Sequence, residues 1–115
     1  VVAVHDGELL LHGPMTAGAR LRLGPCACVE VQGVRVLLAS AKMQMLDLDL
    51  FRFLGVEPHA MRVLVLKSSV HFRADFGAIA GRILVVEAPG PNIADPAKLP
   101  FRKLRPGMRT SPRRQ

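Results

Sequence analysis

The stretch RVLVLKSSVHFRADFGAIAGRILVV, residues 62–86, contains the clearest signals for regular structure in the chain. Residues 62–66 and 82–86 are rich in valine, leucine and isoleucine, which predicts strands buried on both faces, as in parallel sheets. Between them, the apolar side chains of residues 71–80 recur at helical spacing, which predicts a helix. A strand, a helix and a strand in this order predict a βαβ unit with a right-handed crossover.

Two turn dipeptides upstream of this unit predict two β-hairpins. Asp6-Gly7 and Gln32-Gly33 each lie between two apolar runs, and glycine readily takes the positive φ that tight hairpin turns need. These turns are expected to join residues 1–5 to residues 8–11 and residues 27–31 to residues 34–39.

A further helix is expected within residues 47–55. Asp47 is a favourable N-cap residue, and Gly55 supplies the stop. Three apolar residues between them fall on one helical stripe, namely Leu50, Phe51 and Leu54. The sequence therefore predicts a mixed α/β domain over residues 1–105, in which two β-hairpins and a βαβ unit form a mixed sheet with two or three short helices.

The net charge of +7 is concentrated at the C-terminal end of the chain. Residues 102–115 contain six of the sixteen basic residues and none of the nine acidic ones, so residues 1–101 carry a net charge of only +1. Proline, glycine and serine in residues 106–115 predict a solvated, disordered basic tail. This location, and the lack of Trp and Tyr for base stacking, disfavour a nucleic-acid-binding protein.

The apolar runs and the cysteines bear on the cellular compartment. No apolar run approaches the ~20 residues of a membrane span, so no membrane partner is expected. Cys26 and Cys28 are one residue apart, a spacing that would strain a disulfide and that lacks the further ligands of a metal site. Two reduced, semi-buried thiols are therefore predicted, which points to a cytoplasmic protein.

Five polar residues follow the strand expected at residues 62–66, namely Lys67, Ser68, Ser69, His71 and Arg73. In α/β sheets, ligands gather at the carboxyl ends of strands, and helix N-termini favour anions. The pattern thus predicts a carboxylate- or phosphate-binding site over residues 68–73, with His71 oriented by Asp75 four residues later. The alternative is structural, with a serine capping the helix and the basic side chains solvated.

The sequence contains no self-contained catalytic motif. It lacks the GxSxG nucleophile elbow and the phosphate-binding loops GxGxxG and GxxxxGK[ST]. His5 and His12 flank the first expected hairpin and can approach each other, but no third metal ligand lies near them in the sequence.

Residues 65–74, VLKSSVHFRA, resemble the C-terminal domain of the MlrC, or microcystinase C, family of metallopeptidases. Weaker similarity continues in the expected order from about residue 7 to residue 105, in Gly13-Pro14-Met15, Leu23-Gly24-Pro25 and residues 29–38, 47–55, 85–90 and 99–102. Two positions depart from the family. Thr16 stands where members usually have an aromatic residue, and residues 107–110 replace a Pro-Ile-Trp-Pro stretch.

The resemblance implies one domain of a zinc-dependent amide hydrolase, with linearised peptides as a substrate class. It implies that the zinc ligands belong to a catalytic domain N-terminal to this chain, and it places Lys67, Ser68, Ser69, His71 and Arg73 on the substrate side of the cleft. The expected partners are a peptide-like or small-molecule substrate and that catalytic domain, and a homo-oligomer stays open. The main alternative is a non-catalytic module that binds a carboxylate or phosphate at residues 68–73.

Overall fold

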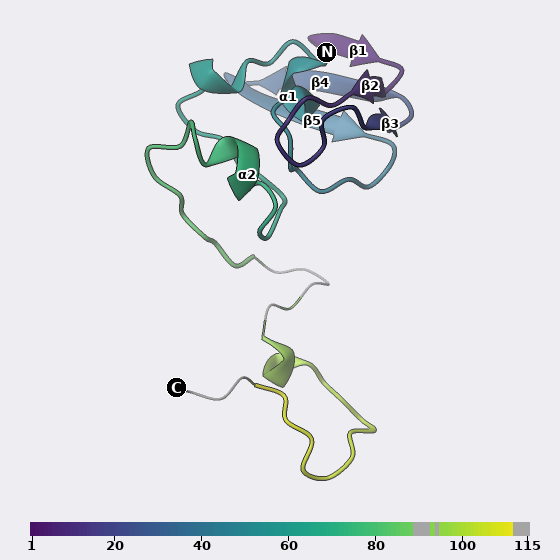
Figure 1. The fold of residues 1–115 in the computed structure, drawn as a ribbon, viewed down its shortest axis with the longest axis vertical. Coiled ribbons are helices and arrows are strands. Elements are labelled where there is room, and N and C mark those ends of the chain that lie inside the picture. Colours follow the sequence, from purple (N-terminus) through teal and green to yellow (C-terminus); the bar gives the residue numbers. More distant parts are fainter. Residues whose placement is uncertain (89–92, 94, 112–115) are drawn as a thin grey trace. The chain divides into compact units, whose positions relative to one another are not determined.

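The computed structural model describes residues 1–88, 93 and 95–111 (Figure 1). The chain divides into two units, Val1–Ile83 and Leu84–Gln115. The first unit contains every strand of the described residues and the hydrophobic core, whereas the second contains the 3-10 helix η2 (Pro96–Lys98). Residues 112–115 of the expected basic tail and the Pro89-Gly90-Pro91 stretch lie outside the described residues.

The strands of the first unit form two small antiparallel sheets. The three-stranded sheet has the order β1-β4-β5, and its strands are β1 (Ala3–His5), β4 (Cys26–Val31) and β5 (Val34–Ala39). The two-stranded sheet pairs β2 (Glu8–Leu10) with β3 (Arg20–Arg22). With the short helices α1 (Asp49–Arg52), η1 (Pro58–Ala60) and α2 (Arg73–Phe76), these sheets confirm the mixed α/β class.

The second predicted hairpin is confirmed. β4 and β5 pair from Val31↔Val34 onward, and the two residues of the turn, Gln32 and Gly33, have φ values of 51° and 79°. Two successive positive φ values match the right-handed twist of the flanking strands, so the turn itself sets the register of the hairpin.

The first predicted hairpin is wrong. β1 pairs with β4 and β2 pairs with β3, so the chain passes from one sheet to the other at Asp6-Gly7. The Asp6 carboxylate accepts a hydrogen bond from the backbone N–H of Glu8, which closes a local turn. Gly7 is packed so tightly that an added Cβ would lie 2.0 Å from the carbonyl oxygen of Gly24. The glycine therefore serves a close backbone approach between the sheets rather than a hairpin turn.

The predicted βαβ unit is also wrong. Residues 62–66 and 82–86 are not part of any sheet of the described residues, and the helix expected over residues 71–80 is reduced to α2. Gly77 follows α2 directly, and after it only the turn-like bonds of Ile79 and Ala80 to the Phe76 carbonyl continue. Glycine is a poor helix former, so the sequence ends the helix earlier than its apolar spacing indicates.

Helix α1 and its flanks follow the sequence prediction. Leu50, Phe51 and Leu54 are buried, and Gly55, with a φ of 75°, ends the turn that follows α1. The Phe51 ring contacts the Phe76 ring edge to face, with centroids 5.9 Å apart. This contact joins α1 to α2 within the core, which contains these buried apolar residues: Leu11, Leu23, Cys26, Cys28, Leu48, Leu50, Phe51, Leu54, Val56, Phe72 and Phe76.

The β1-β4-β5 sheet is apolar on both faces. One face buries the side chains of Cys26 and Cys28 in the core. Because side chains alternate along a strand, the other face presents the neighbouring residues, which include the exposed Val4, Val36 and Leu38. No helix of the described residues is long and apolar enough to cross a membrane.

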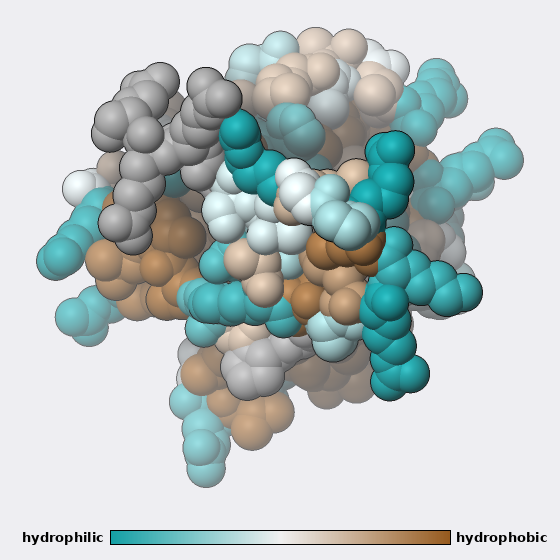
Figure 2. Space-filling view, turned by 90° about the horizontal axis from the view of Figure 1, so that it is seen from below, coloured by the Kyte–Doolittle hydropathy of each residue, from teal (hydrophilic) through white to brown (hydrophobic). Residues whose placement is uncertain are grey.

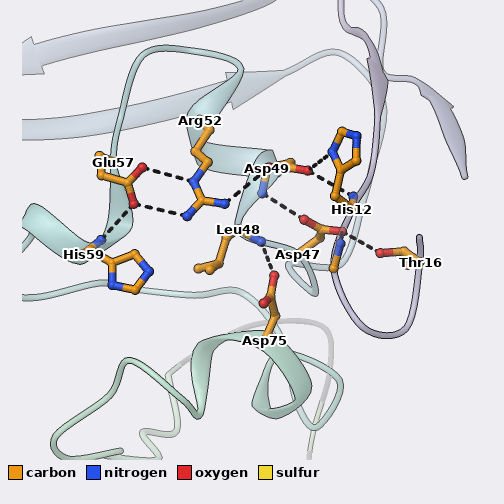
Figure 3. Close-up of polar contacts among 10 residues, drawn as sticks. His12, Thr16, Asp47, Leu48, Asp49, Arg52, Glu57, His59 and Asp75 are labelled. Atoms are coloured by element: carbon orange, nitrogen blue, oxygen red, sulfur yellow. Dashed lines mark hydrogen bonds and ion pairs between the residues drawn. The ribbon is translucent and has the colours of Figure 1, made fainter. Parts of the chain in front are cut away.

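One buried carboxylate joins two distant segments of the first unit (Figure 3). Asp47, only 1% exposed, accepts hydrogen bonds from the N–H of Gly13 (2.8 Å), the hydroxyl of Thr16 (2.5 Å) and the N–H of Asp49 (2.8 Å). The last bond satisfies an amide at the start of α1, although the N-cap residue is Leu48 and not Asp47 as the sequence predicted. The first two hold the turn that begins at Gly13 against the same helix start.

Replacing Asp47 with alanine is expected to lower the free energy of unfolding by about 3 kcal/mol, because buried donors lose a charged partner. Urea denaturation monitored by circular dichroism measures the change. Asp6→Ala is the matched control, because the Asp6 side chain is largely exposed and its loss should cost less than about 1 kcal/mol. Equal losses in the two variants would contradict the central position of Asp47.

Candidate functional site

The five candidate residues lie on the segment that leads from residues 62–66 into α2. Lys67, Ser69, His71 and Arg73 are exposed, whereas Ser68 is half-buried. The side chains therefore differ in how they can meet a ligand. Those of Lys67, Ser69, His71 and Arg73 are open to one, and the hydroxyl oxygen of Ser68 is buried with no hydrogen-bond partner among the described residues.

Gln44 links two of the candidate residues. Its side-chain amide donates to the Ser69 hydroxyl over 3.4 Å, and its carbonyl oxygen lies 2.8 Å from Nδ1 of His71. Because that oxygen only accepts, the proton of a neutral His71 belongs on Nδ1, which leaves Nε2 as an acceptor. The sequence analysis missed Gln44, since it lies 27 residues before His71 in a segment without regular structure.

The predicted pairing of His71 with Asp75 is wrong. The Asp75 carboxylate instead accepts a hydrogen bond of 2.7 Å from the backbone N–H of Leu48 (Figure 3). An i, i+4 pair needs a continuous helix, and α2 begins only at Arg73. The neutral amide of Gln44 therefore orients the imidazole of His71, and Asp75 helps to position the segment before α1.

The helix start offers no set of free amides for an anion. The backbone N–H groups of Arg73, Ala74 and Asp75 donate to the carbonyl oxygens of residues 70, 71 and 72. Neither serine caps the helix, since the N-cap residue is Phe72 and no side chain caps it. With four residues, α2 also has little dipole to contribute. The helix-terminus argument for carboxylate or phosphate binding, and the capping alternative, both lose their basis.

Arg73 is held by an aromatic ring rather than by an acid. Its guanidinium carbon lies 5.1 Å from the centroid of the Phe72 ring, a cation–π distance. Phe72 is buried, so the ring is a fixed support for the exposed cation. No ion pair of Lys67 or Arg73 occurs within the described part of the chain, so both positive charges face solvent.

The histidines of the first unit lie in separate environments. His12 Nδ1 contacts the Asp49 carboxylate at 2.7 Å, whereas the His5 ring packs edge to face on Phe53 with centroids 5.2 Å apart. Across residues 1–88, 93 and 95–111, no three His, Cys, Asp or Glu side chains are placed to hold a metal ion. The described residues therefore do not fit a zinc site.

Asp49 and Glu57 are the two acids of this region with a lowered pKa, and Asp49 is the one that contacts His12 (Figure 3). Burial raises the pKa of its carboxyl group, but hydrogen bonds from the imidazole and the backbone N–H of His12 outweigh burial, with a further contribution from Arg52. The pKa of Asp49 consequently lies below its ordinary value of 3.8. The ionised carboxylate thus fastens His12 to the first turn of α1.

Residues 1–103 match the family described as the MlrC C-terminus. This match spans most of the chain, and the chain therefore belongs to the MlrC C-terminal family. A relative from Sphingomonas sp., named microcystinase C, is 33% identical over 69 residues. The matched segment makes up 60% of this chain but 14% of the relative, so the chain spans only a small part of that protein.

The lowered pKa of Asp49 predicts how acid affects stability. Its ionisation contributes fully above the unfolded pKa near 3.8, and this contribution is lost as the pH falls through the lower folded value. The free energy of unfolding of Asp49→Asn should be lower than that of the unchanged protein at neutral pH. As the pH falls from about 5 to 2.5, however, it should decrease less than that of the unchanged protein. Urea denaturation at a series of pH values measures this, and parallel curves for the two proteins would contradict it.

Proposed function

We propose that this chain works as the C-terminal, substrate-side domain of a zinc-dependent amide hydrolase of the MlrC type. The family match over residues 1–103 is the observation that supports this proposal most strongly. The similarity to microcystinase C favours an enzyme that cleaves amide bonds in peptides. We take linear peptides as the substrate class and the cytoplasm as the compartment, where the two free cysteines stay reduced.

The zinc site in this proposal belongs to polypeptide outside this chain. The described residues provide no cluster of metal-binding side chains. A catalytic zinc needs about three protein ligands in close proximity. The contribution of this chain is therefore binding and orientation of the substrate, beside a catalytic domain that holds the metal.

The candidate residues suit the recognition of a peptide. Arg73 presents a guanidinium whose planar fork matches a carboxylate, and its support by Phe72 limits its freedom. His71 offers Nε2 to an amide N–H, because Gln44 occupies Nδ1. Lys67 and the hydroxyl of Ser69 add a positive charge and a further hydrogen-bonding group on the same segment, whereas the buried hydroxyl of Ser68 would have to become accessible before it could contribute.

The isolated chain is expected to bind no stoichiometric zinc and to hydrolyse no peptide, because a catalytic zinc needs ligands that it does not provide. Metal analysis of the purified chain after zinc incubation and dialysis, together with a peptide-hydrolysis assay, tests this. One zinc per chain with chelator-sensitive hydrolysis would show that the active site is on this chain. This result would overturn the proposal that the zinc site lies in another domain.

The substrate role of Arg73 and His71 is testable in a hybrid enzyme, in which this chain replaces the corresponding C-terminal segment of Sphingomonas microcystinase C. Arg73→Lys and His71→Ala should each lower kcat/KM for a linear peptide by about ten-fold or more, which corresponds to about 1.4 kcal/mol. Arg35→Lys is the matched control, since Arg35 pairs with Glu30 at the end of the β4–β5 hairpin and should leave the rate unchanged.

Thermal unfolding of the same variants separates binding from folding. Both candidate side chains are exposed, so their replacement should shift the melting temperature by only a few degrees. Full activity with a lowered melting temperature would assign the segment to the fold and would contradict the substrate role.

A further inference from the structure

Residues 62–66 have two unlike faces. Leu64 and Leu66 pack against the hydrophobic core. Val63 and Val65, which alternate with them, are 78% and 86% exposed. Apolar side chains also reach the surface between charged ones in the view of Figure 2. Side chains that alternate in this way are typical of a β-strand, yet the segment lies in neither sheet of the described residues.

The backbone of this segment is unpaired as well. Within the described residues, no backbone hydrogen bond joins residues 62–69 to another part of the chain. Protein backbones usually satisfy their N–H and C=O groups inside regular structure, and an exposed strand edge is a template for another strand. Residues 62–66 thus combine exposed valines with two free edges, and valine and leucine suit a strand surrounded by other strands.

We infer that residues 62–66 pair with a β-strand from the part of the MlrC-type hydrolase that lies outside this chain. This inference rests on the proposed function. In the microcystinase C relative, the matched residues make up only 14% of the polypeptide, so most of such a protein is available to supply the strand. The incoming strand presents aliphatic side chains to Val63 and Val65, and its ends are neutral or acidic because Arg62 and Lys67 flank the apolar run.

The outer face of the β1-β4-β5 sheet is a weaker candidate for this partner. It exposes valines and a leucine, but each of its strands is hydrogen-bonded on at least one side, with β4 paired on both sides and β1 and β5 on one. At residues 62–66, the exposed valine side chains lack packing neighbours, and the backbone N–H and C=O groups lack hydrogen-bond partners among the described residues. One added strand would provide both the packing and the hydrogen bonds. The same strand also brings the partner polypeptide beside Lys67, the first candidate residue, because the motif starts where the segment ends.

The inference is tested by measuring how the 115-residue chain binds the part of Sphingomonas microcystinase C that lies outside the matched segment. Isothermal titration calorimetry gives the Kd. Val65→Pro removes one backbone donor from the free edge while replacing an exposed side chain, and it should weaken binding by ten-fold or more. Val65→Thr is the matched control, because it keeps the β-branched shape and the N–H, and it should change the Kd by less than about three-fold.

Circular dichroism and thermal unfolding show whether Val65→Pro keeps the fold. If it does not, Val65→Lys replaces it, because a charge at this exposed position opposes an aliphatic neighbour without touching the backbone. Wild-type binding that both variants leave unchanged would overturn the strand pairing while leaving the proposed function intact. No binding at all would overturn the inference, and the hybrid enzyme would then decide the proposed function by itself. Association of two copies of this chain that Val65→Pro abolishes would reassign the strand to a second copy.

Discussion

The buried carboxylate of Asp47 is the contact on which the arrangement of the first unit depends. It accepts hydrogen bonds from residues 31 and 34 positions away in the sequence, as well as from the start of α1. Gly13 is required at this contact, because a Cβ there would lie 2.6 Å from the Asp47 carboxylate. The hydroxyl of Thr16 donates to the same carboxylate. Helix α1, once fixed, carries Phe51 to Phe76 and so positions α2 and the segment before it.

The sequence correctly predicted those elements whose conformation is determined by residues close together in the chain. The positive φ values at Gln32-Gly33 and the buried stripe on α1 depend on residues only a few positions apart. Asp6-Gly7 has an equally good turn signal, but close packing of Gly7 on Gly24 directs the chain into a second sheet. The composition of residues 62–66 predicted a strand buried on both faces, but Leu64 and Leu66 pack against the core while Val63 and Val65 are exposed. The segment lacks partner strands within the described residues, and a single sequence does not reveal which polypeptide supplies a partner.

In the candidate site, too, contacts between residues close in sequence were easier to predict than contacts with distant residues. Sequence spacing grouped Ser69 with His71, which Gln44 joins in the structure, but it gave them the wrong support, a helix terminus and a neighbouring aspartate. The observed support comes from Gln44, whose position no helical or strand periodicity indicates. The amide oxygen of Gln44 fixes the tautomer of a neutral His71 and leaves Nε2 as the hydrogen-bond acceptor of the ring.

The two cysteines on the inner face of β4 make the opening of this core measurable. Cys26 and Cys28 are 2% and 0% exposed, and burial raises the pKa of the Cys26 thiol, whose Sγ also donates to the Gly24 carbonyl. Only the thiolate reacts rapidly with alkylating reagents, so both sulfurs are shielded by sterics and Cys26 by protonation as well. Each labelling event requires the β1-β4-β5 sheet to separate from the side chains beneath it. The rate of alkylation therefore reports how often the domain opens far enough to expose these cysteines, and no probe has to be introduced to measure it.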